Sequence, residues 1–177
     1  MYPFIRLAKE IIKALRQPPL PIDGVHVSHH LCWPWDLDMW MELNNGRTLT
    51  LFDLGRVPFG IRAGIARTLR EQRWGGAVAG ASVMYRRRVR MFDRIELRTR
   101  LIGWDDKFTY TEQSMWTRGT CANHILVRAA TTDKNGIVRN DRVLAAMGFP
   151  DAKSPPLPNW VAGWIEADTH RPWPPDF

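Results

Sequence analysis

The sequence predicts an α+β fold in which a curved antiparallel sheet wraps around one long central helix. Three observations lead to this prediction. One long helical pattern begins at Asn44–Asn45 and runs to about Arg73. A run of four strand-like segments then follows, joined by short turn signals. Short connections require antiparallel pairing, and a long helix needs a sheet to cover its apolar face.

Composition limits the class of protein. The 177 residues suit one domain with a single core, and 45% apolar with 24% charged residues is ordinary for a globular chain. The net charge of +7 favours an anionic partner, which could be a nucleic acid, an anionic lipid or a phosphorylated small molecule. Cys32 and Cys121 allow one disulfide, but the favoured interpretation is two reduced thiols. No apolar run is long enough for a membrane span, so we expect a cytoplasmic protein.

The N-terminal segment, residues 3–16, has the pattern of an amphipathic basic helix. Its apolar residues recur at helical spacing, and Lys9, Lys13 and Arg16 fall elsewhere on the helical wheel. Such a helix can lie on a membrane surface, which would make the protein membrane-peripheral. Packing on its own domain or on a partner subunit is the favoured interpretation. The prolines of "QPPLP" end the helix, so residues 1–21 form a helix and linker.

The central helix is preceded by a strand over residues 25–33. Asparagine is a good N-cap, so the pair after the intervening loop predicts the helix start. We expect Pro58 to kink or restart the helix and "WGG" at 74–76 to end it. The whole helix would hold about 25 residues and span about 37 Å.

The strands that follow have alternating polarity. The first, from Ala81 to Met91, places Arg86, Arg88 and Arg90 on one face. "GWDDK", "TRGT" and "DKNG" are turn or connection signals, and a short helix over 141–148 ends the core. The other strands cover residues 95–102, 107–116 and 122–132. We expect a core domain over 22–150 and a Pro- and Trp-rich extension over 151–177 that drapes over its surface.

Acids and amides gather just before the central helix. Asp36 and Asp38 stand in the loop, and Asn44 and Asn45 start the helix. A carboxylate can act as a base, and the free N–H groups of a helix start can polarise a carbonyl. Aspartates in this position also commonly cap turns or pair with arginine, and an Asn-Asn start can be a cap alone. Both interpretations stay open on the residues alone.

Two stretches carry a family resemblance. "DLDMWMELNNGRTLTLFDLGR" resembles the Asp-x-x-x-His-x-Asn-Asn-x-Arg-Tyr-Leu motif of hot-dog-fold acyl-CoA thioesterases of the 4-hydroxybenzoyl-CoA thioesterase-like group. "YRRRVRMFDRIELRTRLIGWDDKFTYTEQ" resembles the branch that contains thioesterase superfamily member six. The resemblance implies a hot-dog fold and a homodimer, or a higher oligomer, with active sites where two subunits meet.

The resemblance also assigns roles. Asp38 matches the motif's catalytic carboxylate, and Asn44 and Asn45 match its paired asparagines at the predicted oxyanion site. Glu42 stands where the motif has histidine, which makes it either a substitute acid or a sign of lost activity. Thr48 stands where the motif has tyrosine.

Arginines are the predicted substrate-binding residues. Arg47 matches the motif arginine, and the guanidinium groups of Arg86 and Arg88 could pair with coenzyme A phosphates. The alternative for the last two is a solvated sheet face or a subunit contact. Asp53 on the helix is a further candidate acid, although an ion pair with Arg56 or Arg47 is the favoured interpretation.

Three functions compete. The leading hypothesis is hydrolysis of the thioester of a fatty or aromatic acyl-CoA, without a metal or other cofactor, because no Cys/His zinc spacing and no glycine-rich phosphate loop occur. The second is an inactive hot-dog domain that binds an acyl chain or lipid. Nucleic-acid binding ranks last, because the tryptophans do not interleave with the basic run, so we expect no nucleic-acid partner.

Overall fold

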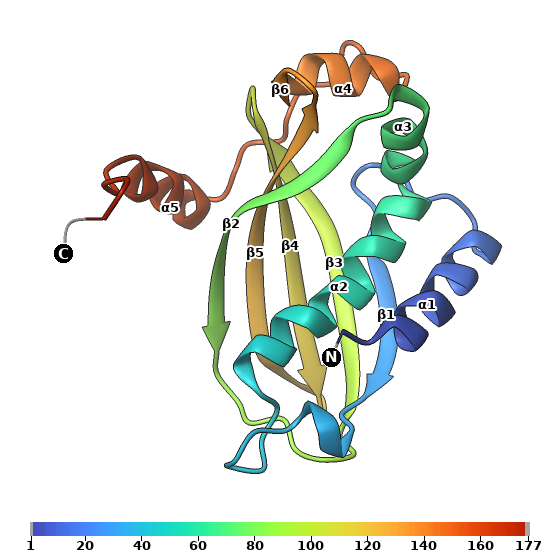
Figure 1. Cartoon of the computed structure of the whole chain (residues 1–177), viewed down its shortest axis with the longest axis vertical. Helices are drawn as coiled ribbons and strands as arrows, with labels where there is room; N and C mark the ends of the chain where they lie inside the picture. The colour runs from blue at the N-terminus through green and yellow to red at the C-terminus, as the bar shows by residue number, and fades with distance from the viewer. Residues whose placement is uncertain (1, 176–177) are drawn as a thin grey trace.

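The computed structural model describes residues 2–175 and has an antiparallel sheet with helices on both of its faces (Figure 1). The sheet order is β1-β3-β4-β5-β2, and β6 pairs with β5. The strands are β1 (His26–Leu31), β2 (Gly75–Tyr85), β3 (Arg94–Trp104), β4 (Phe108–Thr117), β5 (Thr120–Asp133) and β6 (Gly136–Val138). The helices are α1 (Phe4–Arg16), the 3₁₀ turn η1 (Pro34–Asp36), α2 (Asn45–Arg62), α3 (Ile65–Gln72), α4 (Asn140–Ala146) and α5 (Asn159–Thr169). The predicted α+β class and the sheet around one central helix are confirmed.

Helix α2 crosses one face of the sheet and forms the core with it (Figure 1). Leu51, Phe52 and Leu54 are completely buried. Gln113 of β4 is also completely buried, and its Nε2 donates to the carbonyl of Phe52 at 2.8 Å. The polar contact and the apolar packing together fix the position of α2 on the strands.

The long helix breaks at a different residue from the predicted one. Pro58 is buried inside α2 without ending it, and the break falls at Gly64, which has a φ of 80°. A left-handed φ is easily reached only by glycine, so Gly64 allows the chain to stop α2 and start α3. The prediction that the helix restarts at Pro58 is therefore wrong.

The predicted basic strand is shifted. Strand β2 begins at Gly75, earlier than predicted, and ends at Tyr85. The amides of Arg86 and Arg87 both donate to the carbonyl of Ala122, at 2.9 and 3.1 Å, where the chain leaves the sheet. The arginines 86, 88 and 90 therefore lie in a loop, and the prediction that they share a strand face is wrong.

The two terminal helices pack on opposite faces. Helix α1 packs on α2, on the side of the sheet where β1 forms the edge (Figure 1). Helix α5 packs through Val161 and Trp164 on Tyr110 and Leu126, whose side chains lie on the other face of the sheet. Arg128 of β5 pairs with Asp168 of α5 at 2.6 Å. In the part of the chain that the structure describes, every helix is too short or too polar to cross a lipid bilayer.

Candidate functional site

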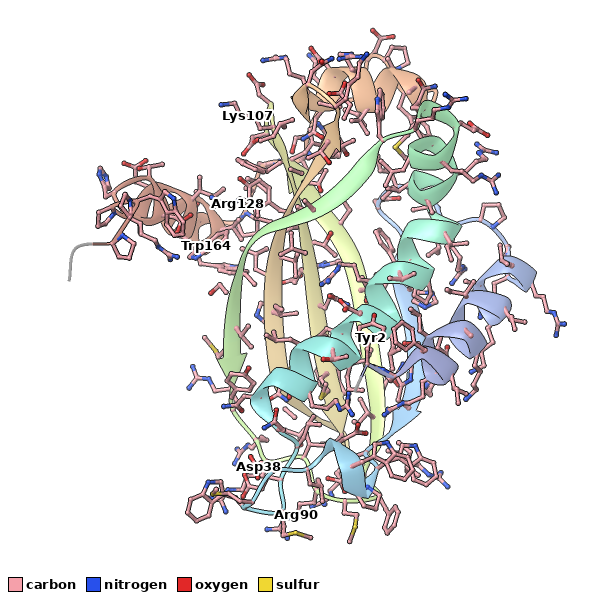
Figure 2. All side chains as sticks on the ribbon, viewed as in Figure 1. Tyr2, Asp38, Arg90, Lys107, Arg128 and Trp164 are labelled. Carbon is pink, nitrogen blue, oxygen red and sulfur yellow. The ribbon has the colours of Figure 1, made fainter. Side chains whose placement is uncertain are left out.

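Two loops lie side by side at the end of the molecule where α2 begins. One covers residues 32–44 and the other covers 86–93. The amide of Leu43 donates to the carbonyl of Val89 at 2.9 Å, and that of Phe92 donates to the carbonyl of Cys32 at 2.7 Å. Asp38 in the first loop and Arg90 in the second both lie at this end in Figure 2. The sequence-predicted acids and arginines are therefore brought together by tertiary contacts.

Asp36 is the buried acid of the first loop. Its side chain is completely inaccessible, and Oδ2 accepts from Arg6 Nη1 at 2.7 Å and from the Trp33 amide at 3.0 Å. Arg47 Nε lies 3.0 Å from Oδ1. One carboxylate thus ties α1, the loop and the first turn of α2 together, and the motif arginine is engaged in this ion pair.

Asp38, two residues later, is bound to its own loop. Its Oδ1 accepts from the Trp40 amide at 2.8 Å and from the Glu42 amide at 3.4 Å. The Asp38 amide donates to the carbonyl of Glu42 at 2.8 Å, which closes a small hairpin. Asp38 therefore holds the backbone of Glu42 in place.

The helix start has the predicted cap. The Asn44 side chain accepts from the Arg47 amide at 3.0 Å, as an N-cap does. Within residues 2–175, the amide N–H groups of Asn45 and Gly46 have no acceptor. Two free donors and the positive end of the helix dipole therefore lie at this point.

Glu42 lines a cavity beside this helix start, which we call the α2 cavity. The cavity has a volume of about 220 Å³. Its lining residues come from both loops, α2, β2 and β5: Glu42, Leu43, Asn45, Tyr85, Arg86, Arg87, Arg88, Val89 and Asn123. Arg88 Nε lies 3.0 Å from Glu42 Oε1, but the Arg88 side chain is 73% exposed, so this ion pair is a weak surface pair. A carboxylate and a helix start therefore share one cavity, and Asp38 is not among its lining residues.

Two further polar groups line the α2 cavity. Asn123 is 4% exposed, and its Oδ1 has no hydrogen-bond partner in the described chain. Tyr85 Oη donates to the Asn45 carbonyl at 3.4 Å, and burial raises the pKa of this hydroxyl, so it stays protonated at neutral pH. The cavity thus offers a free acceptor and a phenol donor.

Next to the α2 cavity lies a wider basic hollow of about 530 Å³. Arginines supply most of its wall, and its lining residues are Arg86, Arg87, Arg88, Arg90, Thr117, Arg118 and Thr120. Asp93 pairs with Arg118 at 2.5 Å. The other lining arginines still give the hollow an excess of positive charge. Guanidinium groups clustered in this way suit a phosphorylated ligand.

The remaining candidates have structural partners. Asp53 pairs with Arg56 and accepts from Tyr2 Oη at 3.2 Å, which confirms the predicted ion pair with Arg56. Burial raises the pKa of the Cys32 thiol to about 11, with smaller contributions from Asp36 and Asp93, so Cys32 is not a thiolate nucleophile at neutral pH. No three His, Cys, Asp or Glu side chains between residues 2 and 175 are grouped to hold a metal ion.

Sequence reasoning missed Tyr85 and Asn123 of this site, and it missed the partner of Asp36. Asp36 was noted, but its pairing with Arg6 crosses from one helix to a distant loop, and no local pattern signals that contact. Tyr85 and Asn123 lie on separate strands, β2 and β5, whose pairing brings Tyr85 opposite Asn123. Their proximity depends on the register between β2 and β5, which no local sequence pattern specifies.

Comparisons with known proteins agree with this fold. The Thioesterase-like superfamily pattern matches residues 32–165. Protein THEM6 of Xenopus laevis is 31% identical over 166 residues, which cover 92% of this chain and 78% of that protein.

Solved structures of thioesterases share the fold. The probable thioesterase YbaW of Escherichia coli has a TM-score of 0.63 at 16% identity, over 69% of this chain and 98% of that one. The DHNA-CoA thioesterase of Staphylococcus aureus has a TM-score of 0.58 at 14% identity, over 82% of this chain and 91% of that one. The predicted hot-dog fold is confirmed by these likenesses.

Proposed function

The chain belongs to the thioesterase-like superfamily, and we propose that it hydrolyses the thioester of a fatty or aromatic acyl-CoA. The observation that carries this proposal is the α2 cavity, which is lined by Glu42 and by Asn45, whose free N–H group lies at the start of α2. Thioester hydrolysis needs a base for water and donors for the carbonyl oxygen, and the cavity offers both.

The step is simple in this geometry. Glu42 takes a proton from water while the water oxygen bonds to the thioester carbon. The negative charge that develops on the carbonyl oxygen is stabilised by the N–H groups of Asn45 and Gly46, as in other oxyanion holes. The carbon–sulfur bond then breaks, and the thiolate of coenzyme A takes the proton from Glu42. A free acid and a thiol are the products.

The basic hollow is the proposed site for the phosphates of coenzyme A. Arg86 and Arg88 line both this hollow and the α2 cavity, so the two spaces adjoin, and the pantetheine arm would run from phosphates in the hollow toward Glu42. Arg88 Nε lies 3.0 Å from Glu42 Oε1. A phosphate that pairs with Arg88 would draw this guanidinium group away from Glu42. Substrate binding would in this way free the base.

Asp38 and Asn44 take positioning roles in this proposal. Asp38 accepts from the Glu42 amide at 3.4 Å, and Asn44 caps the first turn that carries the donors. Arg47 acts through its ion pair with Asp36, 3.0 Å away, by fixing the helix start. The alternative, taken from the motif alone, keeps Asp38 as the catalytic carboxylate.

Matched variants distinguish the two acids. We expect Glu42→Gln to lower kcat by about 100-fold or more, because a general base contributes about 10²–10⁴ in rate. Asp38→Asn keeps an oxygen that can accept from the same amides, so its kcat should fall less than about fivefold. The measurement is thiol release from acyl-CoAs of varied chain length.

Other outcomes decide among the alternatives. An inactive Asp38→Asn variant beside an active Glu42→Gln variant would restore Asp38 as the base. If the wild-type protein binds acyl-CoA and releases no thiol across the panel, the chain is a non-catalytic acyl-binding domain.

A homodimer through β2 is the second part of the proposal. Strand β2 pairs with β5 on one side only, and its other edge is unpaired in the described chain. It holds neither a proline nor a charged residue from Gly75 to Tyr85, and Val78 is 56% exposed. Such an open apolar edge is a template for pairing with a second copy. Because Tyr85 ends β2 and lines the α2 cavity, this pairing would bring the partner close to the site.

A charge on that edge tests the dimer. We expect Val78→Lys to give a monomer at micromolar concentration, measured by light scattering after gel filtration, since lysine on an edge strand opposes pairing. Ile137→Lys is the control, because Ile137 is 48% exposed on the short strand β6. A wild-type monomer, or a Val78→Lys protein that stays dimeric, would contradict pairing through β2.

A further inference from the structure

Helix α1 leaves much of its apolar side exposed to solvent. Four of its large apolar side chains face solvent: Phe4 is 69%, Ile5 88%, Ile12 50% and Leu15 69% exposed. The side that faces the protein is mixed: Leu7 and Ala14 pack there beside Glu10, which is 3% exposed, and Arg6 pairs with Asp36. An amphipathic helix on a globular protein normally buries its apolar stripe, so four large apolar side chains left in solvent are unusual.

Basic residues border the exposed stripe. At 100° per residue, Phe4, Leu15, Ile12 and Ile5 fall within one 100° sector of the helix. Arg16, Lys9 and Lys13 fall within the next 80° of the wheel, on one side of the stripe. Glu10 lies 3.0 Å from Lys13 and neutralises only part of this charge. An apolar stripe with a cationic border matches the interface of an anionic bilayer, where lipid tails meet negative headgroups.

We propose that α1 docks in the plane of an anionic lipid bilayer, with Ile5 and Ile12 inserted among the lipids. The helix has 13 residues, which is too short to span the bilayer. A second copy of the chain is a weaker candidate for the occupant. The edge open for self-association is β2, whereas α1 lies at the opposite, β1 side of the sheet (Figure 1).

The helix is held firmly enough to act as a docking element. Ala14 is 3% exposed where α1 packs on the protein, and Arg6 also donates to the Leu31 carbonyl at 3.0 Å. Arg6 joins α1 to Asp36 in the loop that precedes α2. A membrane that binds α1 would therefore lie on a helix directly connected to the candidate site.

Vesicle binding tests this inference without any substrate, so its outcome is independent of the proposed hydrolysis. We expect the wild-type protein to co-sediment with vesicles of phosphatidylcholine mixed with phosphatidylglycerol, and less with pure phosphatidylcholine or in high salt. The double variant Ile5→Glu/Ile12→Glu should lower the partition coefficient by about 100-fold or more, since each buried isoleucine is replaced by a charge.

A matched control separates the stripe from general surface hydrophobicity. Ile137 is 48% exposed against 50% for Ile12, and it lies on β6, so Ile137→Glu should bind vesicles as the wild-type protein does. The proposal is overturned if the wild-type protein does not bind anionic vesicles or if the double variant binds equally well. It is also overturned if the double variant changes the oligomeric state, because the stripe would then contact a second copy.

Discussion

Helices α1 and α2 lie next to each other and use their apolar residues in opposite ways. Helix α2 has seven buried residues, among them Leu51, Phe52 and Leu54. Helix α1 has two, Glu10 and Ala14, and its Ile5 and Ile12 face solvent. The sequence of α1 has the cleaner amphipathic pattern, yet α2 supplies the core.

The difference shows what periodicity can and cannot tell. A helical apolar stripe predicts that another surface covers it, but that surface need not belong to the same chain. The pattern of α1 alone favours a helix that packs on its own domain or on a partner subunit. The structure places α1 on its own domain through a mixed side that includes Leu7 and Glu10, and leaves the stripe of Phe4, Ile5, Ile12 and Leu15 uncovered in the described residues.

The sharpest test of this contrast removes the same side chain from each helix. We expect Phe52→Ala to lower the free energy of unfolding by about 3–5 kcal/mol, because a completely buried ring leaves a cavity. Phe4→Ala, at a residue that is 69% exposed, should change it by less than about 0.5 kcal/mol. Urea unfolding of both variants gives the comparison. Equal losses would mean that the Phe4 ring is covered in solution.

A second test concerns the space beneath α1. His30 lines a cavity with Arg6, Lys9 and Glu10, and Ser28 Oγ lies 2.9 Å from its Nε2. Burial, followed by the charges of Arg6, Lys13, Lys9 and His29, lowers the pKa of His30 to about 3. The unfolded chain therefore binds a proton that the folded chain excludes, so stability is full above pH 6.5 and is lost as the pH falls below it.

Replacing the ring should reduce this acid sensitivity. Between pH 6.5 and 4.5 we expect the wild-type protein to lose about 2 kcal/mol more than His30→Gln, measured by urea unfolding at each pH. His170→Gln is the control, since His170 lies on the exposed side of α5. Parallel pH profiles for the wild-type protein and His30→Gln would show that the cavity admits the charged ring.

The smallest expected effect concerns how closely α2 approaches the sheet. A Cβ at Gly55 would lie 2.7 Å from Thr99 Oγ1, so Gly55→Ala should cost about 1 kcal/mol net of the gain in helix propensity. A Cβ at Gly60, in the same helix, would meet nothing within 4 Å. Gly60→Ala should therefore be neutral or stabilise by up to about 1 kcal/mol. If both variants have the same thermal midpoint, the packing of α2 is looser than the distance implies.

Much of the fold was predictable because its signals are local. The cap at Asn44, the alternation in the later strands and the turns "TRGT" and "DKNG" all predicted elements that the structure contains. The break at Gly64 was missed because Pro58 is the stronger local signal, and burial of Pro58 within α2 overrides it. The arginine loop was missed because the end of β2 depends on the Ala122 carbonyl, which lies on another strand.

The candidate site was predictable in its ingredients and not in its arrangement. The sequence by itself determined the helix start, the two loop acids, the basic run and the family, since these depend on neighbouring residues. The tertiary structure decided that Asp36 is clamped by Arg6, that Asp38 closes a hairpin, and that Glu42 lines the cavity. It also decided which side of α1 faces outward. Burial and ion pairing depend on residues far apart in the chain, and a periodic pattern carries no information on which layer will cover it.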